Sequence, residues 1–296
     1  MNVDYKNKFN SILLKVFSYT IDFLERNNLQ YWVGQGTAIG AVRHHGMIPW
    51  DDDIDIYLIR DDYNKLLSLR EEIKKEGYRI TSGLDKGNPV PFAKIYDPNT
   101  TLWEDKNYPY IIGVYVDVYP LDQLDTDKKR AMALYYKDKA LLGRYQRSLY
   151  TCSIKELGSL LFHGRLLTFM FALKNLICYK PFTQLYYKKF IQFDNSINEG
   201  KGHLLLSIGG GFGERELYPS SWFDESIEMP FESFSVKVPS GYDAYLTQMY
   251  GDYMTPPPVE KRVLKHGQLR YYINLKEGLS LGEVKNRIKQ GETLVY

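Results

Sequence analysis

The sequence predicts an α+β fold: a mixed sheet flanked by helices, with an added helical segment. Three observations support this prediction. Residues 4–28 carry apolar side chains at helical spacing, short runs between residues 31 and 118 have strand character, and residues 126–198 return to a helical pattern. The 296-residue chain is 44% hydrophobic and 15% aromatic, which is enough apolar material for a substantial core and disfavours disorder.

The first helix is expected over residues 4–28, where seven apolar side chains fall on one face: Phe9, Ile12, Leu13, Val16, Phe17, Ile21 and Leu24. The sheet is then expected from strands at 31–33, 54–58, 79–81, 93–96 and 114–118, with a short helix after Gly36 and a longer one over 61–76. The helical pattern of residues 126–198 is broken at Pro181. Beyond it, the glycines at 209–211 and the prolines at 219, 230 and 239 predict turns, residues 242–250 a helix, and the prolines at 256–258 an extended bend.

The most informative segment is residues 46–56, Gly-Met-Ile-Pro-Trp-Asp-Asp-Asp-Ile-Asp-Ile, because it ends in a strand with acids at alternate positions. Successive side chains of a strand point to opposite faces, so Asp53 and Asp55 share one face while Ile54 and Ile56 enter the core. Two carboxylates held this close repel each other unless a cation lies between them. The alternation therefore predicts a divalent metal ion.

A second acidic strand, Val-Tyr-Val-Asp-Val at 114–118, repeats the alternation with Asp117 on its polar face. If the two strands are neighbours, three carboxylates meet, which suits Mg²⁺ or Mn²⁺, because hard cations take carboxylates, water and substrate phosphates. Upstream, the run Gly-Gln-Gly-Thr-Ala-Ile-Gly at 34–40 follows a short apolar strand and opens a helix. Backbone N–H groups at such a start favour an anion, so together the features indicate phosphoryl transfer.

Other interpretations of the acids compete with a metal site for phosphoryl transfer. An acid cluster after a proline turn is often only a solvated loop, although the alternation argues against this. Asp51, Asp53 and Asp55 also occupy the first three ligand positions of an EF-hand loop, but that loop requires Gly at the position of Ile56 and Glu at that of Asp62, so it is excluded. The glycine-rich run alone is weak evidence, since it is neither a Walker loop nor G-x-G-x-x-G.

The charge distribution sets one segment apart. Residues 126–201 contain 14 Lys/Arg and 5 Asp/Glu, a local charge of +9 in a chain whose net charge is +2. Such a segment suits nucleic acid, an anionic bilayer or a phosphorylated glycan, or is a solvated helical face. It has no zinc-finger or RNP signature, so nucleic acid is not expected. The apolar run 160–179 is interrupted by His163, Arg165 and Lys174, so it falls short of spanning a bilayer, while peripheral membrane contact is expected.

The two cysteines, Cys152 and Cys178, cannot form a disulfide framework, and the polar start lacks an apolar signal region. We therefore expect a cytoplasmic location, with peripheral contact at the inner face of the membrane. The chain divides into a catalytic core at residues 1–125, the basic helical segment at 126–201, and a C-terminal part at 202–296 that completes the catalytic unit.

Three motifs give the sequence a family resemblance: Gly-Thr-Ala-Ile-Gly-Ala-Val-Arg at 36–43, Ile-Pro-Trp-Asp-Asp-Asp-Ile-Asp at 48–55, and Val-Asp-Val-Tyr-Pro-Leu-Asp at 116–122. They resemble the motifs of the LicD family, a group that also includes fukutin-related protein. Further matches at 93–101, 222–224, 230–232, 238–242 and 250–253 extend the resemblance over most of the chain, the basic helical segment being least typical. The resemblance implies a nucleotidyltransferase-like fold, related to the polymerase beta catalytic module.

The resemblance also implies an enzyme that transfers a phospho-substituent, such as phosphocholine, from a CDP-linked donor. The acceptor would be a hydroxyl of a cell-surface glycan, a lipopolysaccharide or teichoic-acid precursor, expected to be lipid-linked. By position, three acids match the family's catalytic and metal-binding residues, of which the last is expected to take the acceptor proton: Asp53, Asp55 and Asp117. Donor contacts are expected from four further residues: Gly36, Thr37, Arg43 and Lys94.

Some departures and alternatives accompany the resemblance. Gln35 stands where the family often has Gly or Ser, and His44-His45 stand where Arg is commonly followed by His-Lys, which bears on donor details rather than on the chemistry. Arg43 alternatively pairs only with the acid cluster, and His45 is expected at the surface. A further candidate is His266 beside Lys265, which is either a phosphate contact or simply solvated.

Two rival functions are carried forward. One is a nucleotidyltransferase that attaches the nucleotide itself to a small molecule or a protein, and the identity of the product separates it from the first hypothesis. The other is a non-catalytic module that binds a glycan or a nucleotide, which metal-dependent turnover would exclude.

Overall fold

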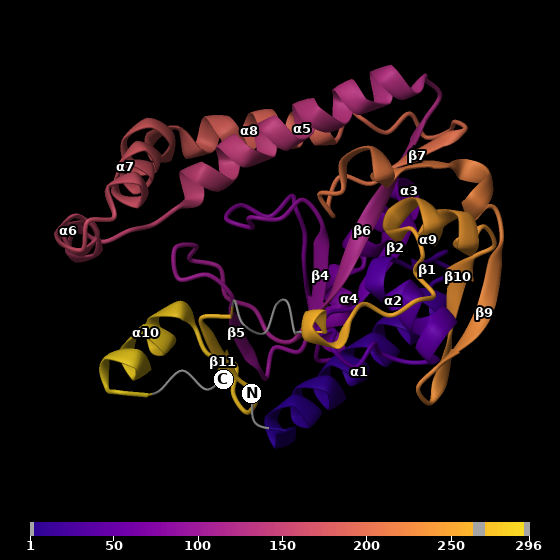
Figure 1. Ribbon diagram of the computed structural model, residues 1–296, viewed down its shortest axis with the longest axis horizontal. Helices are drawn as coiled ribbons and strands as arrows, with labels where there is room; N and C mark the ends of the chain where they lie inside the picture. The colour runs from indigo at the N-terminus through magenta and orange to yellow at the C-terminus, as the bar shows by residue number, and fades with distance from the viewer. Residues whose placement is uncertain (1–2, 263–269, 293–296) are drawn as a thin grey trace.

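The computed structural model describes residues 3–262 and 270–292, and this part of the chain has the predicted α+β architecture (Figure 1). Seven strands form the main sheet: β1 (Trp32–Val33), β2 (Asp55–Ile59), β3 (Arg79–Thr81), β4 (Ala93–Tyr96), β6 (Tyr115–Leu124), β7 (Leu204–Leu206) and β8 (Leu217–Pro219). Their order is β1-β2-β6-β4-β3, with β7 paired to β6 and β8 to β7. Strands β2 and β6 run parallel and the other pairs antiparallel, so the sheet is mixed, as predicted.

Helix α1 (Val3–Arg26) is the packed scaffold that its apolar spacing predicts. Phe9, Leu13, Val16, Phe17 and Leu24 are each at most 2% exposed, because their spacing places them on one helical face against the sheet. Further helices lie between and after the strands: α2 (Gln35–Ile39), α3 (Arg60–Ser68), α4 (Arg70–Lys75), α9 (Tyr242–Tyr250) and α10 (Leu281–Lys289). The main hydrophobic core extends from Phe9 to Leu275, so residues from both ends of the chain pack together.

The region after residue 202 contains strands where the sequence predicts turns and short pieces. Strands β9 (Ser226–Phe231) and β10 (Phe234–Pro239) form an antiparallel hairpin, with Pro230 opposite Ser235 and Pro239 opposite Ser226. A two-stranded ribbon accommodates proline, since each strand has an outer edge whose N–H groups need no partner. The prediction of turns at Pro230 and Pro239 was therefore wrong, because proline is compatible with these strands.

Three more elements were not predicted: β5 (Thr101–Trp103), β11 (Tyr272–Asn274), which pairs with it, and helix α10. Of these, α10 has a readable signal, because Ser280 and Glu283 form a capping box at its start. The single helix expected over residues 61–76 is instead α3 followed by α4. At the junction the Leu69 N–H donates to the Leu66 carbonyl (3.1 Å), a three-residue bond that interrupts the α-helical pattern.

The basic segment is helical, as predicted, and consists of α5 (Lys128–Leu149), α6 (Ile154–Phe162), α7 (Leu166–Lys174) and α8 (Thr183–Asp194). Helices α5 and α8 lie side by side, joined by a cluster of Leu142, Tyr145 and Phe190, whereas α6 and α7 lie at one end of the molecule (Figure 1). Pro181 falls in a short 3₁₀ turn before α8, where a break was expected. No helix within the described residues combines the length and the hydropathy that crossing a bilayer requires, as predicted for residues 160–179.

A buried ion network joins this segment to the sheet. Arg60 at the start of α3 donates to both carboxylate oxygens of Asp122 on β6 (2.6 and 2.7 Å) and to Asp194 at the end of α8 (3.4 Å). All three side chains are at most 6% exposed. Asp138 on α5 lies near the same network with 0% exposure, and its carboxylate makes no hydrogen bond within the described residues.

Candidate active site

The two acidic strands are neighbours, which is the condition under which their carboxylates were expected to meet and which the family resemblance implied. Parallel strands β2 and β6 pair with Asp55 directly opposite Asp117, and the Asp117 N–H donates to the carbonyl of Ile54 (2.9 Å). Both carboxylates are buried, at 4% and 6% exposure. Because facing positions of neighbouring strands carry side chains on the same face of the sheet, the backbone register brings these two acids together.

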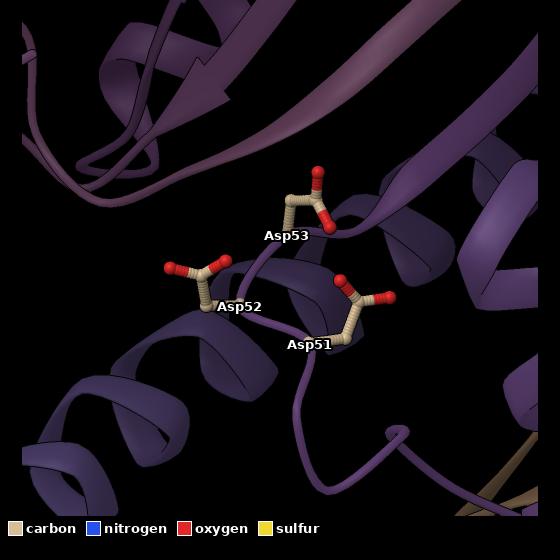
Figure 2. A group of neighbouring side chains, drawn as sticks. All are labelled: Asp51, Asp52 and Asp53. Atoms are coloured by element: carbon tan, nitrogen blue, oxygen red, sulfur yellow. The ribbon is translucent and has the colours of Figure 1, made fainter. Parts of the chain in front are cut away.

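The acids that precede and start β2 alternate between two environments. Asp51, Asp53 and Asp55 line a cavity of about 430 Å³, whereas Ile54 is 1% exposed in the core. Figure 2 shows the carboxylate of Asp52 on the opposite side of the chain from that of Asp51. The predicted sharing of one face by Asp53 and Asp55 is therefore confirmed, and Asp51, which the prediction did not include, joins them.

Asp52 has a structural partner instead. Its carboxylate forms an ion pair with Arg270 (3.0 Å), which also donates to the Asp52 carbonyl (3.1 Å), and both side chains are at most 3% exposed. The Arg270 guanidinium in turn lies over the ring of Phe9, 4.5 Å from its centroid. Ligand oxygens of Asp51, Asp52 and Asp53 all lie within 4.8 Å of one another. The ion pair nevertheless assigns Asp52 to holding the acidic loop against α1 rather than to the cavity.

The glycine-rich turn is hydrogen-bonded to the acidic strand. The Gly34 N–H donates to the Asp55 carbonyl (2.9 Å), and the Asp55 N–H donates to Oγ1 of Thr37 (2.9 Å). Gln35 between them lines the cavity and has φ +46°, a left-handed conformation that residues with a Cβ rarely adopt. Gly36 also lines the cavity, and a Cβ there would lie only 2.5 Å from Oδ2 of Asp51. Position 36 is therefore glycine because an acid occupies the space of a side chain.

Lys94 on β4 is the cationic partner of Asp117. The two residues face each other in the antiparallel β4–β6 pair, and Nζ of Lys94 lies 2.7 Å from Oδ1 of Asp117. The ammonium group also lies 3.4 Å from the centroid of the Tyr115 ring. Burial raises the pKa of Asp117 to about 6, although the charge and hydrogen bond of Lys94 oppose the rise. Lys94 is 3% exposed and does not line the cavity, so it contacts Asp117 from within the protein interior.

Asp55 forms no such ion pair within the described residues. Its Oδ1 is buried and makes no hydrogen bond among the residues that the structure describes. Burial raises the pKa of Asp55 well above its usual range, and the charges of three neighbouring acids raise it further against the opposing charge of Lys94: Asp53, Asp117 and Asp51. A buried oxygen without a partner among like charges is the situation that a divalent cation relieves. The carboxylates of Asp53, Asp55 and Asp117 thus form a donor set that fits a hard cation.

Arg43 contributes positive charge to the cavity wall. It lies in the π-helical turn η1 (Gly40–His44) that continues α2, and it donates to the Tyr253 carbonyl and to Nδ1 of His44 (3.3 Å). Burial lowers its pKa, and so does the nearby Arg262, which lies over the ring of Trp50. Within the described residues these hydrogen bonds do not go to the acid cluster, contrary to the alternative role considered for Arg43.

Other predicted residues lie away from the cavity or outside the structure. His45 is exposed, as expected, with φ +56° at the end of the turn. Lys265 and His266 lie outside the described residues. Thr37 is 5% exposed and, like Lys94, does not line the cavity. Of the four residues expected to contact a donor, Gly36 and Arg43 line the cavity.

The rest of the cavity wall comes from distant parts of the chain. Phe212 and Tyr250 pack edge to face, with ring centroids 5.9 Å apart, and Trp50 and Tyr253 add further aromatic surface. Sequence reasoning did not assign these residues to the site. The matched segments at 48–55 and 250–253 carried a signal for Trp50, Tyr250 and Tyr253, whereas Phe212, next to a glycine run, carried none.

Comparison with known proteins agrees with this geometry. The sequence model of the family described as LicD/FKTN/FKRP, nucleotidyltransferase domain, matches residues 28–168. Residues 28–168 are a LicD-family nucleotidyltransferase domain. The match contains the acids of β2 and β6, the glycine-rich turn, Arg43 and Lys94.

Proteins similar to this chain differ in how much of it they cover. The lipopolysaccharide cholinephosphotransferase LicD of Haemophilus influenzae is 29% identical over 267 residues, which are 88% of this chain and 96% of the relative. The human ribitol 5-phosphate transferase FKRP is 36% identical over 52 residues, which are 18% of this chain and 10% of FKRP. The first alignment extends well beyond residues 28–168, so the likeness includes parts of the chain outside the nucleotidyltransferase domain.

Proposed function

We propose that this chain is a metal-dependent phosphotransferase that moves a phosphocholine-like group from a CDP-linked donor to a hydroxyl of a cell-surface glycan. The observation that carries the proposal is the pairing of Asp55 with Asp117 across parallel strands, beside a cavity that Asp53 and Asp55 line. The name of the Haemophilus influenzae relative supports the transferred group and a lipopolysaccharide-type acceptor. A teichoic-acid precursor is an acceptor of the same chemical kind, a lipid-linked glycan hydroxyl.

Asp53, Asp55 and Asp117 would hold Mg²⁺ or Mn²⁺. Support comes from the donor set itself, since three carboxylates suit a hard cation, and from the unpartnered Oδ1 of Asp55. When bound, the ion would neutralise charge on the donor phosphates and on the leaving group. The carboxylates would orient it, while Lys94 holds Asp117 in place through their 2.7 Å ion pair.

The cavity would hold the donor. Its volume of about 430 Å³ falls in the range of sites for small molecules. Arg43 would contact the donor phosphates, because a guanidinium matches phosphate oxygens well. Phe212, Tyr250 and Trp50 offer faces and edges against which a cytosine ring can pack. Thr37 would act indirectly, by holding the backbone of Asp55.

The proposed reaction is a displacement at the distal phosphorus of the donor. The acceptor oxygen forms a new P–O bond, the bond from that phosphorus to the bridging oxygen breaks, and CMP leaves with the bridging oxygen. The hydroxyl proton passes to a carboxylate, for which we assign Asp117. Most of the work is positioning and charge neutralisation, as is general for phosphoryl transfer.

Chromatography of reactions with CDP-choline, CDP-ribitol, CDP-glycerol or CDP-ethanolamine, a glycan acceptor and Mg²⁺ tests the proposal. We expect one donor to yield CMP together with an acceptor that carries the phospho-head group. A cytidine-bearing acceptor without free CMP would instead identify a nucleotidyltransferase. No turnover of any donor, with full binding of nucleotide, would identify a non-catalytic module. A cytoplasmic location belongs to the same proposal, since CDP-linked donors would have to reach the site.

A further inference from the structure

Helices α6 and α7 expose apolar side chains to a degree that sets them apart from the rest of the chain. Phe162 is 88% exposed, Leu167 84% and Ile154 89%. Every residue from 161 to 171 except Phe169 is exposed, and among the described residues no side chain of α6 is buried. We call residues 154–174 the α6–α7 hairpin. In Figure 1 it lies at the end of the helical layer, past the ends of α5 and α8.

The distribution of apolar residues on α7 is not that of a helix packed on a protein core. A surface helix packed on a core turns its apolar stripe inward, but the exposed Leu166, Leu167, Met170, Phe171 and Leu173 of α7 share one half of the helix, opposite the buried Ala172. None of the hairpin's side chains belongs to a hydrophobic cluster of the described part of the chain. The apolar side of α7 is therefore turned away from the protein, and an exposed apolar face of this kind indicates a surface that another apolar phase covers.

The ionised residues around the hairpin are mostly basic. Residues 154–182 contain Lys155, Arg165, Lys174 and Lys180 against the single acid Glu156. Glu156 is already engaged, because it closes the capping box with Ser153 and lies 3.5 Å from Lys106. The four basic side chains are exposed, and apart from Glu156 no acid of residues 154–182 offsets their charge.

We propose that the α6–α7 hairpin inserts into the interfacial layer of a bilayer that contains anionic phospholipids. Apolar side chains enter the acyl boundary while Lys and Arg meet the headgroups, which is how peripheral helices combine two weak attractions. Each helix has nine residues and is roughly 14 Å long. That is about half of the ~30 Å hydrocarbon thickness, so the hairpin lies in one leaflet and does not cross.

Charge favours a bilayer over a second copy of this chain as the occupant. Two hairpins packed on each other would bring their basic residues together with only Glu156 to offset them, and like charges at an apolar contact oppose association. Anionic headgroups supply the missing negative charge. The inference is independent of the proposed function, since membrane binding requires neither the donor nor the acids of β2.

Co-sedimentation with vesicles of phosphatidylcholine, with and without phosphatidylglycerol, tests the proposal on the full chain. We expect the protein to partition to the anionic vesicles, and the double variant Phe162→Asp/Leu167→Asp to lose about tenfold or more in partition. Phe162→Ser/Leu167→Ser should lose somewhat less, because it adds no negative charge. Tyr136→Asp is the matched control: Tyr136 is 58% exposed on α5, outside the hairpin, so the same change should leave partition nearly intact.

A second measurement locates the inserted residue. In Phe162→Trp, vesicles with brominated acyl chains should quench more fluorescence than in the wild type, whose four tryptophans form the background. Equal partition of the wild type and the double variant would overturn the proposal, as would the absence of any vesicle binding. A dimer in solution that the same two substitutions dissociate would assign the surface to a second copy instead. Nucleotide binding to each variant verifies that the cavity is unaffected.

Discussion

Strand β6 carries two buried aspartates five residues apart, Asp117 and Asp122, and their surroundings differ in how the charge is compensated. Asp122 receives two hydrogen bonds from Arg60, which also contacts Asp194. Asp117 receives one from Lys94 and lies opposite Asp55, whose Oδ1 makes no hydrogen bond within the described residues. The Arg60 site is held together by its own cation, whereas Asp55 forms no ion pair within the described residues and lies among carboxylates whose charges raise its pKa.

The difference separates a structural acid cluster from a functional one. Removing one partner of a satisfied buried ion pair costs stability, because the other charge is left without compensation. Removing one of several competing carboxylates relieves repulsion, so its effect should fall on chemistry instead. The following substitutions test whether activity and stability divide between the two ends of β6 in this way.

The largest effect is expected for Asp55→Asn. Loss of a metal-binding charge should lower kcat/KM by about 10³-fold or more, since metal-assisted charge neutralisation contributes several kcal/mol. The melting temperature should not fall, because the neutral amide replaces a carboxylate surrounded by like charges. Turnover assays and thermal melts measure both, with Asp61→Asn on the exposed start of α3 as a control. Near-wild-type turnover in Asp55→Asn, or full activity in a chelator, would contradict the metal site.

The next largest effect is expected for Arg60→Met. It leaves Asp122 and Asp194 buried without their cation, and should lower the free energy of unfolding by about 3–5 kcal/mol. Arg26→Ala is the matched control, because Arg26 pairs with Glu76 at the surface, where solvent screening leaves such a pair little effect on stability. Denaturant titration measures both. If Arg60→Met/Asp122→Asn is no more stable than Arg60→Met, the charge interpretation is wrong.

Asp138, which lies near the Arg60 site, should make the free energy of unfolding depend on pH. Burial, with the charges of Asp194 and Asp122, raises its pKa to about 8, against the opposing charges of Arg60 and Lys139. Between about pH 4 and pH 8 the folded chain then keeps a proton that the unfolded chain releases, so stability falls as pH rises, by at most about 1.4 kcal/mol per unit. Asp138→Asn cannot ionise, and its advantage over the wild type should grow through this window and level off above it. A constant difference from pH 4 to pH 9 would refute the shift.

The two ends of β6 also differ in what the sequence could predict. The Asp55 end was largely predictable, because alternation within residues 51–56 and 114–118 fixes which side chains share a face. That the two strands are neighbours was implied only by the family resemblance. The Arg60 end was not predictable, since Arg60 in α3 and Asp194 in α8 come together only when the chain has folded. The same holds for the cavity wall: Phe212 reaches the acids through the tertiary fold alone. Local spacing predicts faces, and long-range packing decides which faces meet.

The smallest effect, and the sharpest test of the functional end, is expected for Thr37→Val. The sequence suggests a direct donor contact, but the structure has Oγ1 of Thr37 accepting the buried N–H of Asp55 (2.9 Å), outside the lining of the cavity. Valine keeps the shape and removes the acceptor, so the free energy of unfolding should fall by about 1–3 kcal/mol. The displaced Asp55 should lower kcat with little change in KM for the donor, and Thr37→Ser should restore both. A raised KM with unchanged stability would mean that the hydroxyl contacts the donor itself. Thr37 would then belong to the donor site, together with Gly36.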